Sequence, residues 1–347
     1  MLFRIRYDPI HQPVNRIIKM MKPLVSVILP FYNAAGTLDR AVSSIAQQEL
    51  DAFECLLVNN NSTDGSREIA REWTRRDPRF RLVDEPRQGV MFAFNTGAEH
   101  ARGRYLARMD ADDVSYPDRL RRQVAFLEEH PGYGAVCGTV KYVSHSEKET
   151  RGFARYVRWV NSVRTYREIL NRRFIESPVV NPSALWRREV GEELGLYRSG
   201  DFPEDYEMWL RWLDQGVKIH KLDPPVMEWH DSEDRLTRTH DIYSDAAFYR
   251  IKTHYLATWL RENNPFHPEV AIWGASRISR RRAQRLTPYG IRFRCYIDTR
   301  KGRQLDHELV YYKDLPRAGE LFILTYIKQM DAREETRDFL EDLGYEE

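Results

Sequence analysis

Cysteine is scarce in this sequence, with three residues among 347. Cys55, Cys137 and Cys295 lie far apart and contain no CxxC pair. An odd number at this spacing argues against a disulfide framework and against a cysteine-ligated zinc site. We therefore expect a protein of a reducing compartment.

Long apolar runs are also missing, and no stretch approaches the ~20 residues that a membrane span needs. The basic segment 1–22 is interrupted by Asp8, Pro9 and Pro13, and no signal-peptide core follows it. We interpret it as a basic arm. The expected location is the cytoplasm, either in solution or peripherally at the membrane surface.

A strong charge of one sign is absent, since the formal net charge is +2. This balance argues against a dedicated nucleic-acid binder, and we expect no nucleic-acid partner. Hydrophobic residues make up 42% of the chain, which is enough for a packed core. The length indicates two or three domains, or one large domain with an appendage.

From Leu24 onward, short apolar runs alternate with segments of helical periodicity. Strands are predicted at 24–30, 53–58, 80–84 and 104–109, with helices at 37–48, 66–73 and 89–101. This alternation predicts an α/β fold with a mostly parallel sheet covered by helices on both faces. Ligands of such sheets bind beyond the carboxyl ends of the strands.

The pattern starts again near Val270, where strand, glycine turn and helix follow one another. We divide the chain into the arm 1–22, a first α/β domain 23–240, a helical segment with linker 241–267, and a second small α/β domain 268–347.

Three carboxylates, Asp110, Asp112 and Asp113, follow the fourth predicted strand in the stretch ARMDADDVSYP. Clustered carboxylates repel one another unless a cation joins them, and a hard divalent ion with oxygen ligands meets this need. An ordinary acidic turn, with an aspartate at the start of the next helix, explains the stretch by itself equally well.

Four motifs together resemble the family 2 glycosyltransferases in order and spacing. They are VSVILPFYNAAGTLDRAVSSIAQQ, ECLLVNNNSTDGS, the segment from Gly89 to Leu127 that contains DADD, and FPEDYEMWLRW. The resemblance covers about 24–240. It implies the A-type glycosyltransferase fold, a nucleotide-sugar donor, Mn²⁺ or Mg²⁺, and inversion at the anomeric carbon.

The resemblance also implies roles for individual residues. The expected donor-binding residues are Pro30, Tyr32, Asn33, Asn60 and Asp110. The expected metal ligands are Asp112, Asp110 and His230, and the expected catalytic residues are the base Asp205 and its neighbour Glu204. A structural role for His230 has equal weight, and Trp209 and Trp212 are assigned to the core because of their helical spacing.

Asn60 departs from the family pattern, which often has aspartate there. An asparagine can accept a hydrogen bond from uracil but also donates one, so the base stays open although a UDP-sugar is favoured.

The second domain resembles a Rossmann unit, because Gly274 follows its first strand and Asp298 ends its second strand. Ser276 and Ser279 occupy the other two glycine positions of the dinucleotide motif. Their side chains obstruct a pyrophosphate, so we expect a docking or regulatory role rather than a dinucleotide site, with the catalytic domain, a second subunit or a partner protein as what it docks.

The expected function is transfer of a sugar from a nucleotide sugar to a glycan or glycolipid acceptor in surface polysaccharide or glycolipid synthesis. Two alternatives stay open at this point. One is an inactive scaffold that binds nucleotide sugars. The other is a nucleotidyltransferase, although the glycine- and lysine-rich loop that would hold a triphosphate is missing after the first strand.

Overall fold

The computed structural model describes residues 22–144, 151–231, 240–301, 307–327 and 329–346. Apart from Lys22, the expected basic arm lies outside these residues. The described residues form two compact units, one ending at His240 and the other beginning at Asp241. Helix α11 (Asp245–Asn263) belongs to the second unit.

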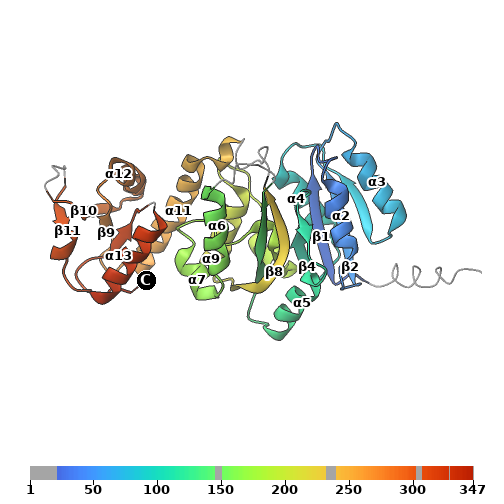
Figure 1. Cartoon of the computed structure of the whole chain (residues 1–347). Helices are drawn as coiled ribbons and strands as arrows, with labels where there is room; N and C mark the ends of the chain where they lie inside the picture. The colour runs from blue at the N-terminus through green and yellow to red at the C-terminus, as the bar shows by residue number, and fades with distance from the viewer. Residues whose placement is uncertain (1–21, 145–150, 232–239, 302–306, 328, 347) are drawn as a thin grey trace, which may run out of the picture. The chain divides into compact units, whose positions relative to one another are not determined.

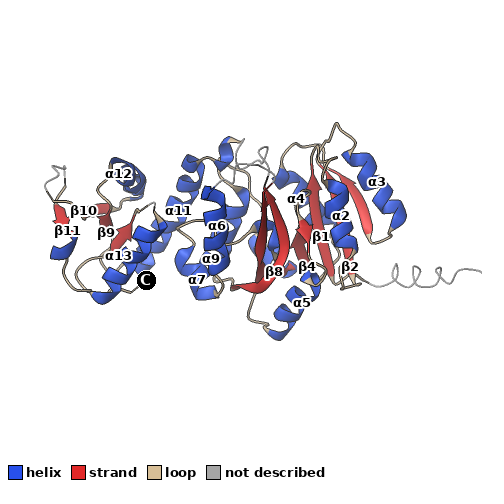
Figure 2. Cartoon of the chain, in the orientation of Figure 1, coloured by secondary structure: helices blue, strands red, loops and turns tan. Residues whose placement is uncertain are grey.

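The described residues of the first unit contain an eight-stranded sheet in the order β3-β2-β1-β4-β7-β6-β8-β5. Its strands are β1 (Val25–Phe31), β2 (Phe53–Asn59), β3 (Phe80–Asp84), β4 (Tyr105–Arg108), β5 (Val114–Ser115), β6 (Ala135–Ser144), β7 (Leu185–Arg187) and β8 (Ile219–Asp231). β1 to β4 pair in parallel, β7 pairs antiparallel with both neighbours, and β5 pairs antiparallel with β8. The mostly parallel α/β sheet predicted from the sequence is confirmed (Figure 2).

The helices of the first unit connect these strands (Figure 1). They are α2 (Leu38–Ala46), α3 (Ser66–Arg76), α4 (Val90–His100), α5 (Arg119–Glu129), α6 (Arg151–Ser162), α7 (Tyr166–Arg172), the 3₁₀ turn η1 (Asn181–Ser183), α8 (Arg188–Leu194) and α9 (Glu204–Asp214).

The two faces of the sheet are covered by different helices. Val27 and Leu29 of β1 share one buried cluster with apolar residues of α2, α3 and α5. On the opposite face, a Cβ built on Gly97 of α4 would lie 2.5 Å from Cγ2 of Ile28 and 2.9 Å from Cγ2 of Val58. Only glycine therefore permits α4 to approach β1 and β2 this closely.

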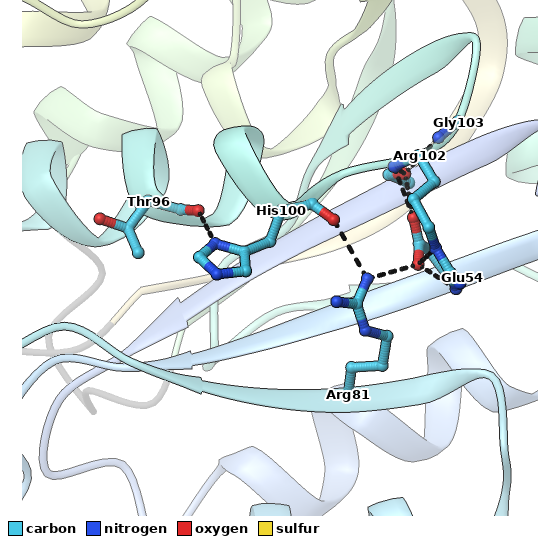
Figure 3. A network of polar contacts seen from close by, with 7 residues as sticks. Glu54, Arg81, Thr96, His100, Arg102 and Gly103 are labelled. Carbon is cyan, nitrogen blue, oxygen red and sulfur yellow. Dashed lines mark hydrogen bonds and ion pairs between the residues drawn. The ribbon is translucent and has the colours of Figure 1, made fainter.

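A buried carboxylate ties the amino ends of β1 and β2 to the loop before β4 (Figure 3). Glu54 accepts hydrogen bonds from Ser26, Arg81 and Arg102 at 2.6 to 3.0 Å. Burial raises the pKa of Glu54, but these hydrogen bonds outweigh it, and the pKa is lowered. This network stabilises the edge of the sheet opposite the predicted site.

The second unit has a four-stranded parallel sheet in the order β11-β10-β9-β12 among its described residues. Its elements are η2 (Asp241–Tyr243), α11, β9 (Glu269–Trp273), α12 (Arg277–Ala283), η3 (Gln284–Tyr289), β10 (Arg292–Asp298), β11 (Leu309–Tyr311), η4 (Tyr312–Asp314), β12 (Ile323–Thr325) and α13 (Met330–Asp342). Its core contains Ala271, Trp273, Cys295 and Ile297.

Ser276 and Ser279 of the second unit both form hydrogen bonds within the protein. Gly274 has φ of 125°, and Ser276 caps α12 by accepting the N–H of Ser279 at 3.1 Å. The Ser279 hydroxyl donates to the carbonyl oxygen of Tyr326 at 2.9 Å.

In the part of the chain that the structure covers, no helix has both the length and the apolar character to cross a bilayer.

Candidate active site

Three loops that the sequence separates meet at one edge of the first sheet. Phe31 pairs with Asn59, and Ile28 pairs with Arg108, in parallel register. The carboxyl ends of β1, β2 and β4 therefore lie side by side, and the segments after them form one surface.

The loop after β1 presents an exposed aromatic ring beside a fixed turn. Tyr32 is 51% exposed, whereas Pro30 is buried within the strand. Asn33 has φ of 47°, and its side-chain oxygen accepts the N–H of Thr63 at 2.8 Å. Its own N–H donates to the hydroxyl of Ser62 at 3.1 Å. Asn33 thus joins the loops after β1 and β2, and Tyr32 offers a face for stacking.

The side chain of Asn60 is bonded to the segment that follows β3. Its Nδ2 donates to the carbonyl oxygens of Glu85 at 3.1 Å and Arg87 at 2.7 Å, and its Oδ1 accepts the N–H of Gly89 at 2.8 Å. Asn60 is also 3% exposed. Both amide protons of Asn60 are in use, so only the second lone pair of its Oδ1 can take part in another hydrogen bond.

The acidic turn after β4 brings three carboxylates together. Single oxygens of Asp110, Asp112 and Asp113 lie within 4.8 Å of one another. Asp110 and Asp112 are partly exposed, but Asp113 is buried and accepts the backbone N–H of His230 at 2.9 Å. Arg40 of α2 donates to the carbonyl oxygen of Asp112 at 2.7 Å.

Two buried arginines accompany the acidic turn, and sequence reasoning missed both. The guanidinium of Arg108 lies 2.5 Å from Oδ1 of Asp110. Arg119, which is fully buried, donates to the carbonyl oxygen of Arg108 at 2.8 Å. Burial lowers the pKa of Arg119 to about 10, against the charges of Asp113 and Asp110, which raise it.

Asp205 lies in the first turn of α9 and close to the acidic turn. Its Oδ1 accepts the N–H of Tyr206 at 2.7 Å. Burial raises the pKa of Asp205 to about 6, the hydrogen bond from Tyr206 lowers it, the charge of Asp110 raises it further, and that of Arg108 lowers it. A helix N-terminus by itself favours the ionised carboxylate, so burial decides the direction here.

The segment before α9 is held by Tyr197. Asn95 of α4 donates to its carbonyl oxygen at 2.9 Å, and Asn181 donates to its hydroxyl at 2.8 Å. The Tyr197 ring packs against Phe94 at 4.6 Å between centroids. Burial raises the pKa of the Tyr197 hydroxyl.

The other predicted residues have mixed surroundings. Glu204 is 6% exposed, next to Asp205. His230 is also 6% exposed, and its Nε2 lies 3.4 Å from a carboxylate oxygen of Glu228. Trp209 and Trp212 are fully buried and pack edge to face, so their assignment to the core is confirmed.

A signal for Arg108 exists in the sequence, because residues i and i+2 near a strand end point to the same face and Asp110 follows at that spacing. Arg119 has no such signal, since an arginine in a helix pattern is normally exposed.

Comparison with known proteins identifies the chain's relatives. The sequence profile of glycosyl transferase family 2 matches residues 26–195. EpsE of Bacillus subtilis, which carries a provisional glycosyltransferase name, is 31% identical over 227 residues, covering 64% of this chain and 78% of EpsE.

Solved structures share the fold. A crystal structure of S. aureus TarS 1-349 in complex with UDP-GlcNAc has a TM-score of 0.54 at 17% identity, covering 76% of this chain and 71% of that one. The mannosyltransferase PcManGT from Pyrobaculum calidifontis, in complex with GDP-Man and Mn²⁺, has a TM-score of 0.50 at 23% identity, covering 70% and 66%. From the profile match and the extent of its similarity to EpsE, the chain belongs to glycosyl transferase family 2.

Proposed function

We propose that this glycosyltransferase moves a sugar from a nucleoside-diphosphate sugar to an acceptor hydroxyl, with inversion at the anomeric carbon. The observation that carries the proposal is the electrostatic coupling of Asp205 to the acidic turn. Asp205 and Asp110 are 95 positions apart, yet the charge of Asp110 raises the pKa of Asp205. A carboxylate suited to accept a proton therefore lies beside the acidic turn of the donor side.

Asp205 is the general base in this proposal. It takes the proton from the acceptor hydroxyl, whose oxygen attacks the anomeric carbon while the bond to the diphosphate breaks. A carboxylate with a pKa of about 6 is ionised at neutral pH and is a stronger base than an ordinary aspartate. Glu204, beside it, is proposed to orient the acceptor.

The residues of the acidic turn fit a divalent cation. Their oxygens converge within 4.8 Å, and the partly exposed Asp112 and Asp110 are the groups that would hold Mn²⁺ or Mg²⁺. When bound, the cation would offset the charge that develops on the leaving diphosphate. Asp113 has another task, because one of its oxygens accepts the N–H of His230. The imidazole of His230 is proposed to reach the same ion or the diphosphate.

The nucleoside is proposed to lie over the loops after β1 and β2. The exposed ring of Tyr32 supports stacking on the base, with Pro30 and Asn33 shaping the loop below it. Oδ1 of Asn60 retains one acceptor position for uracil N3–H. UDP is favoured for this reason, and the bound UDP-GlcNAc of TarS and GDP-Man of PcManGT support a nucleotide sugar in general.

The acceptor is proposed to be a glycan or glycolipid of the cell surface, reached from the cytoplasmic side. The second unit is proposed to dock a further subunit or partner protein. Its helix α12 is capped internally by Ser276, which supports docking over a dinucleotide site.

A donor screen tests this function. The full chain is incubated with UDP- and GDP-sugars and Mn²⁺, and release of free nucleoside diphosphate is measured with and without candidate acceptors. Asp205→Asn should lower turnover by ~10²–10⁴ while the affinity for the donor changes little. The matched control is Asp214→Asn, which removes an exposed carboxylate from the far end of the same helix. Native-like turnover of Asp205→Asn would show that another residue is the general base.

A further inference from the structure

Two buried arginines offset part of the negative charge of the acidic turn. Three carboxylates, Asp110, Asp112 and Asp113, lie together with two arginines that are almost completely buried. Arg108 is 4% exposed, and Arg119 is fully buried. Buried cations of this kind persist only when they are paired, so their partners define what they do.

Arg108 is paired with Asp110. Its Nη2 lies 2.5 Å from Oδ1 of Asp110, and its Nη1 donates to the carbonyl oxygen of Met109 at 3.0 Å. The side chain also lies over the ring of Phe94, 5.6 Å from its centroid. These contacts hold a positive charge at one of the two carboxylates that are proposed to meet the metal.

Arg119 contacts the backbone directly before the acidic turn. It donates to the carbonyl oxygens of Arg108 at 2.8 Å and Ala184 at 3.4 Å, and to Oε1 of Gln123 at 3.1 Å. Its charge acts on Asp113 and Asp110. The two guanidinium groups thus offset two of the three carboxylates of the turn, and the neighbouring Asp205 adds a further negative charge when it is ionised.

We propose that Arg108, through the positive charge that it places beside Asp110, keeps the affinity of the 110–113 turn for a divalent cation low in the absence of nucleotide. A cation then binds firmly only with a diphosphate, which supplies further negative charge and oxygen ligands. This inference rests on the proposed function for the diphosphate, but it concerns Mn²⁺ binding and is tested without glycosyl transfer.

The test is a titration of nucleotide-free protein with Mn²⁺, followed by electron paramagnetic resonance of the free ion. Arg108→Gln should bind Mn²⁺ at least about tenfold more tightly than the native chain, because a positive charge within a few ångströms of a divalent ion is removed. The control is Arg104→Gln, which replaces the arginine directly before β4. Arg104 is exposed and pairs with Glu128 at 2.8 Å, so its loss should leave the Mn²⁺ affinity unchanged.

A folded Arg108→Gln protein with native or weaker Mn²⁺ affinity overturns the proposal, as does an equal gain in Arg104→Gln. If Arg108→Gln does not fold, the comparison moves to Asp110→Asn with and without Arg108→Gln, because Asp110→Asn removes the carboxylate that Arg108→Gln would leave unpaired. Asp110→Asn alone should weaken Mn²⁺ binding about tenfold, and adding Arg108→Gln should recover most of that loss. Equal affinities of these two variants overturn the proposal. Loss of transfer alongside the expected Mn²⁺ shifts would count against the proposed function alone.

Discussion

The carboxylate of Asp113 accepts a hydrogen bond of 2.9 Å from the backbone N–H of His230, across 117 positions of the chain. Asp113 is 1% exposed, and its charge also acts on the buried Arg119. One side chain of the acidic turn therefore fastens β8 to the loop that carries Asp110 and Asp112. The third aspartate of the turn therefore has a structural task.

Asp113→Ala should lower the free energy of unfolding by about 3–5 kcal/mol. The substitution leaves the N–H of His230 without its acceptor and removes a carboxylate from the surroundings of the buried Arg119. Asp113→Asn keeps an acceptor oxygen and should cost about half as much. Urea unfolding followed by tryptophan fluorescence measures both, and equal small losses would contradict the structural role.

Asn60→Asp should destabilise the protein by about 2–4 kcal/mol, although aspartate is common at this position in the family. The new carboxylate would face the carbonyl oxygens of Glu85 and Arg87, and two donated hydrogen bonds would be lost. Asn61→Asp is the control, because Asn61 is exposed with φ of 66°, a conformation that aspartate tolerates. Thermal unfolding of the two variants checks this, and a more stable Asn60→Asp would argue against the observed amide contacts.

Asp112→Asn should abolish the Mn²⁺-dependent part of nucleoside diphosphate binding and leave the fold intact. Asp112 is partly exposed in the acidic turn, so losing one oxygen charge there removes a ligand without opening the core. Calorimetry with UDP, with and without EDTA, measures the effect. Identical metal dependence in native and variant proteins would show that the cation binds elsewhere.

The pH dependence of kcat/KM should follow Asp205. The folded protein raises the pKa of this carboxyl to about 6, and a general base works only when deprotonated. Activity should therefore fall about tenfold per pH unit below pH 6 and stay level above it. Initial rates between pH 5 and 8 check this, with circular dichroism as a control for unfolding; full activity at pH 5 would exclude Asp205 as the base.

NAD and NADP should not bind the full chain with micromolar affinity. Ser276 already accepts the N–H of Ser279 at the start of α12, and both serines add side chains where a pyrophosphate would approach the backbone. Calorimetry is done with excess UDP and Mn²⁺, so that the first unit is occupied. A micromolar dissociation constant for either dinucleotide would contradict the docking role and show that the second unit contains a ligand site.

Much of the fold was readable from the sequence because it rests on local pattern. Apolar runs of strand length alternating with amphipathic helices predict a parallel sheet, and ligands of such a sheet bind beyond the carboxyl ends of its strands. The polar segments after β1, β2 and β4 contain Tyr32, Asn33 and the acidic turn, and the resemblance to the family 2 glycosyltransferases supplied the roles expected of them.

The partners of these residues were decided only by the tertiary structure. Nothing local links Asp113 to His230, or Asn60 to Gly89, and no helix pattern predicts that Arg119 is buried. The sequence determined which chemical groups follow each strand, because local propensity and periodicity act over a few residues. Packing of distant segments determined the charge state and the hydrogen-bond partners of these groups. Burial and neighbouring charges raise the pKa of Asp205, and packing brings Arg108 into an ion pair with Asp110.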